Sequence, residues 1–234
     1  MSEAWAAREL FCLQCPSGAL EPLRTGTKVV DFSCPECAAR YQVKSKQGNF
    51  GRVVTNSAYQ AKIDAIEAGT VPNYVFVGYS SNLWRVTSGF VVPGHFITTS
   101  VIQKRKPLGP TARRHGWVGS NILLGDIPQD GRVALIENGF PRTPVNVRRD
   151  WSRFVFMREK GAEARGWLGD ILRVVRELEK PSFHLSEVYA LESELRKLHP
   201  NNRHIVEKIR QQVQLLRDKG ILESLGRGRY ELRD

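Results

Sequence analysis

The arrangement of this chain is decided by one stretch, which reads Asp31-Phe32-Ser33-Cys34-Pro35-Glu36-Cys37-Ala38-Ala39-Arg40-Tyr41-Gln42-Val43-Lys44. Residues 27–33 and 40–45 are rich in β-forming side chains and predict two short strands, joined by a turn that contains two cysteines. Side chains two residues apart on a strand point to the same face, so we expect Gln42 and Lys44 side by side. The stretch therefore predicts a hairpin that presents an acid, an amide and an ammonium.

The turn of this hairpin is the second half of a four-cysteine pattern. The pairs Cys12/Cys15 and Cys34/Cys37 are both Cys-x-x-Cys, and 18 residues separate them. This spacing is typical of a zinc ribbon, in which each turn supplies two thiolates to a tetrahedron. Four sulfur ligands leave no open position, so the predicted zinc is structural and holds the N-terminal segment against the hairpin. Redox-active cysteines are the alternative.

Asp31, Gln42 and Lys44 have the spacing of the nuclease motif Asp…Glu-x-Lys, with glutamine in the place of glutamate. In that motif the two acids hold Mg²⁺, and the lysine orients the attacking water or stabilises charge on the phosphate. An amide oxygen can also ligate a hard cation but brings no negative charge, so we expect weaker metal binding here. The spacing alone also fits an ordinary surface pair of an Asp and a Lys.

Positive charge is concentrated in the first two thirds of the chain. The formal net charge is +11, and residues 166–234 hold 13 Lys and Arg against 11 Asp and Glu. Such clustering favours nucleic acid as the partner, because neutralisation of phosphates releases counterions. The two clusters consist of Lys104, Arg105, Lys106, Arg113 and Arg114, and of Arg142, Arg148, Arg149 and Arg153.

The remainder of the first 160 residues predicts an α/β or α+β domain with a central sheet. Residues 45–50 are polar and predict a loop, and residues 57–69 predict a helix that ends at Gly69. Apolar runs predict strands at 73–79, 83–92 and 131–137. Residues 104–121 are basic and rich in Gly and Pro, which favours a functional loop. In it, Arg113 and Arg114 are candidates for phosphate or guanine contacts, and Trp117 for either stacking or core packing.

A second domain, residues 166–234, follows a polar boundary at 157–166. Periodicity predicts helices at 167–179, at 186–200 with Ser186 as its cap, and after a cap at Asn202. Residues 220–232 alternate as a hairpin, so the domain is expected to be a winged helix with its third helix in the major groove. A winged helix that mediates only protein contacts is the alternative. The candidate DNA-binding residues of this domain are Asn202, Arg203, His204, Lys208, Gln211, Arg227 and Arg229.

Three stretches resemble a known family. Residues 30–50 with their cysteines, residues 104–122 and residues 201–220 are similar to DpnI-type methyl-directed restriction endonucleases, the Dam-replacing family. The resemblance implies a PD-(D/E)xK nuclease core with a four-cysteine zinc, then a winged-helix domain. It implies cleavage of double-stranded DNA at GATC sites that contain N6-methyladenine, with structural Zn²⁺ and catalytic Mg²⁺ or Mn²⁺. By position, Asp31 matches the metal-binding acid, Lys44 the motif lysine and Trp117 the aromatic that contacts the methyl groups.

The expected partner is therefore duplex DNA with methylated adenine, bound by a chain that is monomeric in solution and able to act as two copies on one site. No apolar run is long enough to span a bilayer and the N-terminus does not resemble a signal peptide, so we expect a cytoplasmic protein without membrane contact. Three alternatives remain: a non-cleaving methylation-sensing DNA-binding protein, a nuclease for a different modified DNA, and a zinc-ribbon RNA-binding protein.

Overall fold

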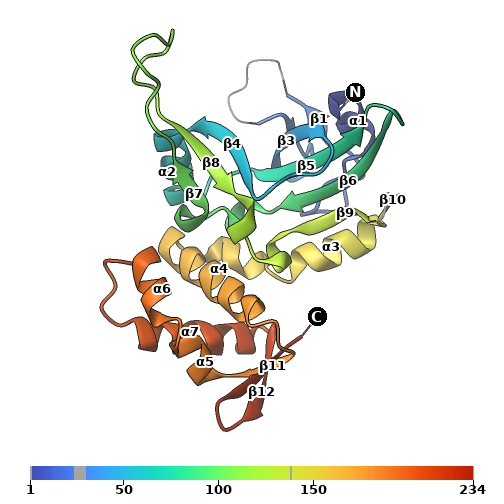
Figure 1. The fold of residues 1–234 in the computed structure, drawn as a ribbon. Helices are drawn as coiled ribbons and strands as arrows, with labels where there is room; N and C mark the ends of the chain where they lie inside the picture. The colour runs from blue at the N-terminus through green and yellow to red at the C-terminus, as the bar shows by residue number, and fades with distance from the viewer. Residues whose placement is uncertain (1, 24–29, 138, 234) are drawn as a thin grey trace.

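The computed structural model describes residues 2–23, 30–137 and 139–233, and it places a sheet-bearing N-terminal part above a smaller helical C-terminal part (Figure 1). Within the described residues, the central sheet has seven strands in the order β1-β2-β3-β5-β6-β9-β10. Strands β3 and β5 are parallel, and the other neighbours are antiparallel. The bounds are β1 Glu21–Pro22, β2 Phe32–Ser33, β3 Arg40–Gln47, β5 Asn73–Ser80, β6 Arg85–Val92, β9 Val133–Glu137 and β10 Phe140–Pro141.

The alternation of side chains along β5 divides the N-terminal part into two cores. Tyr74 and Phe76 face one core, which also holds Ile66 of helix α2 (Tyr59–Glu67). Val75 and Val77 face the other, which also holds Trp151 of helix α3 (Pro144–Ser152). Successive strand residues point to opposite faces, so a strand covered on both sides needs this unbroken apolar run. The second core also includes helix α1 (Ser2–Glu9) and the cysteine-bearing segment.

A second, antiparallel sheet has the order β4-β8-β7 and lies beside α2. Its strands are β4 Val53–Ala58, β7 Ile102–Lys104 and β8 Gly119–Leu123. The loop 105–118, which joins β7 and β8, projects away from the body of the molecule (Figure 1). Most of its residues are exposed. The sheet thus serves as a base for the basic loop that the sequence predicts.

The C-terminal part contains four helices and a three-stranded sheet of order β11-β13-β12 within the described residues. Helix α7 buries Ile205, Ile209, Val213 and Leu216, which confirms the predicted apolar stripe. Strands β12 and β13 form the predicted hairpin, and β11 is an additional strand. The bounds are α4 Ala162–Glu177, β11 Ser182–His184, α5 Leu185–Tyr189, α6 Glu192–Leu198, α7 Ile205–Asp218, β12 Leu222–Gly226 and β13 Arg229–Leu232.

Several predicted boundaries in the C-terminal part were wrong. Helix α4 begins at Ala162, inside the segment expected to be an irregular boundary. The second predicted helix is two helices, α5 and α6, and its cap is His184: the imidazole accepts from the Ser186 amide, and Glu187 accepts from the His184 amide. Asn202 is not the cap of α7, which is His204; the Asn202 amide oxygen accepts from the His204 backbone N–H at 2.8 Å.

Corrections also apply to the N-terminal part. Residues 45–47, expected in a loop, continue strand β3, because β5 offers pairing partners as far as Tyr79. Of the strand expected at 27–33, residues 27–29 lie outside the described residues, and Phe32–Ser33 form β2. The strand expected from Leu83 begins at Arg85, after a turn in which Trp84 has φ +46°. Within the described chain, none of the helices combines the length and apolar character needed to cross a bilayer.

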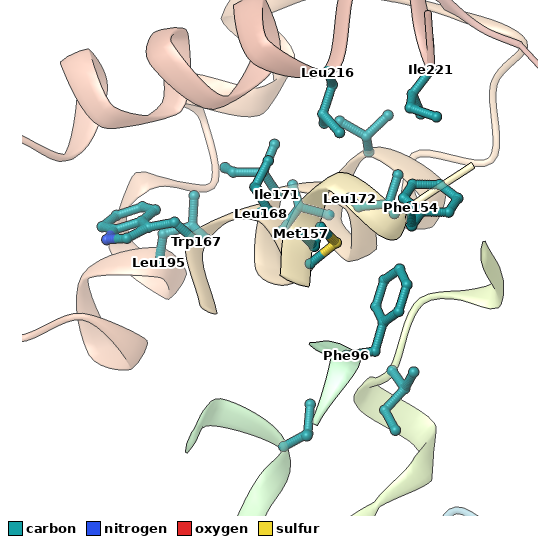
Figure 2. Close-up of a cluster of buried hydrophobic side chains, with 14 of the residues drawn as sticks. Phe96, Phe154, Met157, Trp167, Leu168, Ile171, Leu172, Leu195, Leu216 and Ile221 are labelled. Atoms are coloured by element: carbon teal, nitrogen blue, oxygen red, sulfur yellow. The ribbon is translucent and has the colours of Figure 1, made fainter. Parts of the chain in front are cut away.

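The two parts share one apolar core. Figure 2 shows Phe96 of the N-terminal part directed toward Phe154, Met157 and Leu172, behind which lie side chains of the C-terminal helices. Two buried carboxylates reinforce this junction. Asp130 accepts from Arg176 of α4 at 2.7 and 2.6 Å, and Asp170 of α4 accepts from the Ser100 hydroxyl at 2.9 Å. Both contacts cross between the two parts and add directional links to the apolar packing that joins them.

Candidate functional site

The four cysteines come together at one point. Cys12 Sγ lies 3.5 Å from Cys37 Sγ, Cys15 Sγ lies 3.5 Å from Cys34 Sγ, and all four sulfurs lie within 4.8 Å of one another. Zinc–sulfur bonds of about 2.3 Å place the corners of a tetrahedron about 3.8 Å apart. The cluster can therefore hold a zinc ion with four sulfur ligands, as predicted.

The protein environment favours the thiolate at Cys34 and opposes it at Cys37. Burial opposes ionisation of Cys34, but hydrogen bonds from the backbone N–H groups of Cys37 and Glu36 lower the pKa of Cys34 to about 6. Burial, together with the neighbouring thiols, raises the pKa of Cys37 to about 12. Four close thiols cannot all ionise without a counter-charge, and a divalent metal supplies it. The chemistry of this donor set thus fits zinc.

Side chains from both sides hold the cysteine-bearing segment in place. Tyr41 is the residue before Gln42 on β3, and its hydroxyl accepts from the Leu13 backbone N–H at 2.9 Å. Arg148 of α3 donates to the Cys12 carbonyl at 2.8 Å and to the Ser17 carbonyl at 2.9 Å. The cluster is thereby tied to β3 and α3, and it fixes the turn that separates β2 from β3. This is the supporting role that the sequence predicts for the metal.

Asp31 lies immediately before β2 and is directed toward β3. Its Oδ2 accepts from the Val43 backbone N–H at 2.7 Å, and its backbone N–H donates to the Tyr41 carbonyl at 2.9 Å. Val43 separates Gln42 from Lys44, so the carboxylate is anchored to the middle of the Gln-x-Lys segment. The side chain of Asp31 is exposed, which leaves its second oxygen accessible to a ligand.

Gln42 and Lys44 lie on the face of the sheet that α2 covers. Their partners in the parallel register are Tyr74 and Phe76, whose side chains belong to the α2-facing core. The Oε1 atom of Gln42 is buried and has no hydrogen-bond partner among the described residues. Burial lowers the pKa of Lys44, and the Asp31 carboxylate opposes this effect. The structure therefore anchors Asp31 to the segment that carries Gln42 and Lys44, and the buried oxygen of Gln42 is available to a donor or a cation.

Two further residues lie beside this segment and were not predicted. Lys62 of α2 donates to the Tyr74 hydroxyl at 2.5 Å, and Asn56 of β4 donates to the same hydroxyl at 3.3 Å. Burial and the charge of Lys44 lower the pKa of Lys62 to about 8. The sequence does contain a signal for Lys62, because it precedes the buried Ile66 by four residues and so shares its helix face.

Trp117 lies in the projecting loop and not in a core. Its ring packs on the backbone of Gly119, where an added Cβ would lie 2.8 Å from the ring. The Arg114 guanidinium lies 4.8 Å from the centre of the ring. Trp117 is half-buried, and both Arg113 and Arg114 are exposed. Of the two predicted roles for Trp117, core packing is thus wrong. The structure shows a ring that is held in place on an exposed basic loop, where it is accessible for stacking.

The predicted DNA-binding residues of the C-terminal part lie just before α7, along the first half of α7 and at the hairpin tip. Arg203, His204 and Gln211 are exposed, whereas Asn202 and Lys208 are partly buried. At the tip, Arg227 and Arg229 are exposed, and Arg227 has φ +49° in the turn between β12 and β13. The His184 ring makes a 3.0 Å hydrogen bond with the Arg227 carbonyl, which connects the tip to the start of α5.

The arginines of the second cluster contact groups of the protein itself. Arg142 is bound to Asp150 at 2.7 Å, and Arg148 is used by the cysteine-bearing segment. Arg149 also faces Asp150, at 3.4 Å. Arg153 donates to the Arg233 carbonyl near the C-terminus. Proximity in sequence was misleading here, because consecutive helix positions point in different directions.

The comparison with protein-family models covers nearly the whole chain. Residues 1–160 match the model described as the Dam-replacing family, and residues 163–232 match the model described as the Dam-replacing HTH domain. The second match begins one residue after the first residue of α4 and includes α7 and the β12–β13 hairpin. A helix–turn–helix domain indicates DNA binding. With both models matched in this order, the chain belongs to the Dam-replacing family, in the DpnI-type form.

Proposed function

We propose that the chain is a methyl-directed restriction endonuclease that cleaves duplex DNA at GATC sites containing N6-methyladenine. In this proposal residues 1–160 are a catalytic domain of the PD-(D/E)xK type and residues 166–234 are a DNA-binding winged helix. The family match supports it. The observation that carries the catalytic part is the anchoring of Asp31 between Gln42 and Lys44, through the 2.7 Å hydrogen bond to the Val43 amide.

The proposed metal ligands are Asp31 and Gln42. A carboxylate with an accessible oxygen and a buried amide oxygen without a partner are donors that suit a hard cation, so the residues fit Mg²⁺ or Mn²⁺. Such an ion supplies a water of lowered pKa and stabilises charge on the phosphate. The low dielectric that depresses the pKa of Lys44 also strengthens its attraction to an anion. Lys44 is therefore the group that binds and orients the scissile phosphodiester.

Recognition of the methyl group is assigned to Trp117. An N6-methyl group places an apolar surface in the major groove, where unmodified adenine presents an N–H donor at N6. The indole gains by covering that methyl, whereas a polar edge loses hydrogen bonds to water when the ring covers it. The exposed Arg113 and Arg114 are suited to the flanking phosphates. Asn202, Arg203, His204, Lys208, Gln211, Arg227 and Arg229 form the second contact surface.

Digestion of two plasmid preparations tests this proposal. One carries N6-methyladenine at every GATC, the other carries none, and both are incubated with the protein and Mg²⁺ or Mn²⁺. We expect cleavage at GATC in the methylated plasmid alone, and loss of that cleavage in Lys44→Ala. Tight binding to methylated DNA without cleavage would instead identify a methylation-sensing DNA-binding protein. Cuts that map to another sequence, or that require another modification, would identify a nuclease for a different DNA.

A further inference from the structure

Lys62 is a charged residue in a place where helices normally bury apolar side chains. It is 1% exposed, on the face of α2 that packs against the sheet. Its ammonium donates to the Tyr74 hydroxyl at 2.5 Å, and within the described chain no carboxylate lies within ion-pair distance of it. Burial of an ammonium without a counter-charge is costly. A group held at this cost beside a reactive cluster is a candidate for a functional role.

The surroundings of Lys62 contain acceptors that lack donors. Gln42, the neighbour of Tyr74 in the register, has a buried Oε1 with no partner in the described residues. Asn56 also has a buried Oδ1 with no such partner, although its Nδ2 donates to the Tyr74 hydroxyl. Both orphaned atoms are oxygens, and an ammonium has three donors, of which Tyr74 uses one. Around Tyr74, two buried oxygens therefore lack a hydrogen-bond donor, and the Lys62 ammonium has N–H groups beyond the one that Tyr74 accepts. A positive charge near these oxygens is favourable.

Lys62 also changes the charge of the candidate site. An Asp…Glu-x-Lys site has a net charge of −1 when all three groups are ionised. Here Asp31 contributes −1, Gln42 nothing, and Lys44 and Lys62 +1 each, so the net charge is +1. A divalent cation is attracted less strongly to such a site, and a phosphodiester more strongly. The hydroxyl of Tyr74 receives two donors, from Lys62 and Asn56, so its own proton is directed elsewhere.

We propose that Lys62 is a built-in cation of the nuclease site, a positioning residue that acts through Tyr74. It supplies fixed positive charge behind Gln42, lowers the affinity of the site for a divalent cation, and raises its affinity for a DNA phosphodiester. This inference rests on the proposed function, since it assumes that Asp31 and Gln42 are the cation ligands. The positive charge of Lys62 explains how a site with an amide at position 42 can still bind a phosphodiester. Part of the positive charge that a tightly bound metal would supply comes from the protein itself.

The test measures cation and DNA binding without turnover. Mn²⁺ affinity is read from the electron paramagnetic resonance signal of free Mn²⁺, and affinity for a methylated GATC duplex is read from fluorescence anisotropy in EDTA. Three proteins are compared with wild type: Lys62→Met, Tyr74→Phe, and the control Lys197→Met, which removes the same charge from the exposed side of α6. Melting temperature and zinc content report whether each variant is folded.

We expect Lys62→Met to bind Mn²⁺ about tenfold more tightly and the duplex several-fold more weakly, because a unit charge near a divalent ion changes its affinity by roughly that factor. Tyr74→Phe, which removes only the hydroxyl that holds Lys62, should shift both affinities in the same directions by a smaller factor. Lys197→Met should leave Mn²⁺ affinity unchanged. Equal Mn²⁺ affinity in wild type and Lys62→Met would overturn the inference and make Lys62 a structural residue.

Two further outcomes are decisive. If Lys62→Met does not fold, unchanged Mn²⁺ affinity in Tyr74→Phe overturns the inference, and a shift supports it. If no protein binds Mn²⁺, including Gln42→Glu, then the site is not a cation site and the inference fails. A shift in Mn²⁺ affinity without any cleavage of methylated plasmid would refute the proposed function and leave the role of Lys62 intact. Cleavage of methylated plasmid without a shift in Mn²⁺ affinity would support the proposed function and refute the role of Lys62.

Discussion

The burial of Lys62 makes a quantitative prediction about stability at alkaline pH. Desolvation, with a smaller contribution from the charge of Lys44, lowers the pKa of this lysine from 10.5 to about 8 in the folded protein. Between these two values the unfolded chain holds a proton that the folded protein has released. The free energy of unfolding must then rise with pH across this window, and below pH 8 the cost of the buried ammonium is present in full.

The size of the effect follows from the shift in pKa. One pKa unit corresponds to about 1.4 kcal/mol, so a pKa lowered from 10.5 to about 8 changes the free energy of unfolding by about 3 kcal/mol over the whole window. Most of this change, about 2 to 3 kcal/mol, falls between pH 7 and pH 10. Lys62 is almost fully buried, so solvent screening does not reduce the figure appreciably.

Guanidinium denaturation of wild type and Lys62→Met at pH 7, 8, 9 and 10, with zinc present, measures this change. Subtraction of the two curves removes the contributions of the cysteines and of other groups common to both proteins. We expect wild type to gain on the variant as the pH rises, with the variant the more stable of the two near neutrality. Parallel curves between pH 7 and pH 10 would refute the reasoning, since Lys62 would then have the same pKa in both states.

Three further predictions concern the metal, the methyl group and the zinc. Gln42→Glu adds a charged ligand and should lower the Mg²⁺ concentration for half-maximal cleavage about tenfold; an unchanged Mg²⁺ dependence would remove position 42 from the ligand set. Trp117→Ala should reduce the ratio of cleavage rates on methylated and unmethylated duplexes, and a preserved ratio would assign methyl recognition elsewhere. Arg148→Met breaks the hydrogen bonds to the Cys12 and Ser17 carbonyls. It should cost about 2 kcal/mol of stability and speed zinc loss to a colorimetric chelator, whereas unchanged kinetics would show that α3 does not retain the metal.

The features that depend on local chemistry could be predicted from the sequence. The spacing of the cysteines predicts their clustering, because two tight turns suffice to assemble four sulfurs. Strand β5 and the apolar stripe of α7 follow from hydrophobic runs and from helical periodicity. The hairpin after Gly220 follows from its glycines, of which Gly226 has φ +84° at the tip. The family resemblance is confirmed over both halves of the chain.

The features that depend on tertiary packing could not be predicted from the sequence. Helix α4 begins at Ala162 because Trp167 and Leu168 pack into a core shared by both parts of the chain, and no local signal reveals that core. The second arginine cluster was assigned to nucleic acid because its neighbours were unknown, yet Arg148 is used by carbonyls more than 100 residues away in sequence. A lysine on a predicted helix is normally assigned to the solvent side, so the position of Lys62 on the helix face of Ile66 is overlooked until Tyr74 is found opposite it.

The most direct test of the account is single-turnover cleavage of a short duplex that contains one GATC site, with Mg²⁺ in excess. Fully methylated and unmethylated duplexes are compared, each with wild type and with Lys44→Ala. We predict rapid double-strand cleavage of the methylated duplex by wild type and rates at least about a hundredfold lower in the other three reactions. For Lys44→Ala this is the loss expected when a group that stabilises transition-state charge is removed; for wild type on the unmethylated duplex it reflects the missing methyl groups. Equal cleavage of both duplexes, or full activity in Lys44→Ala, would contradict it.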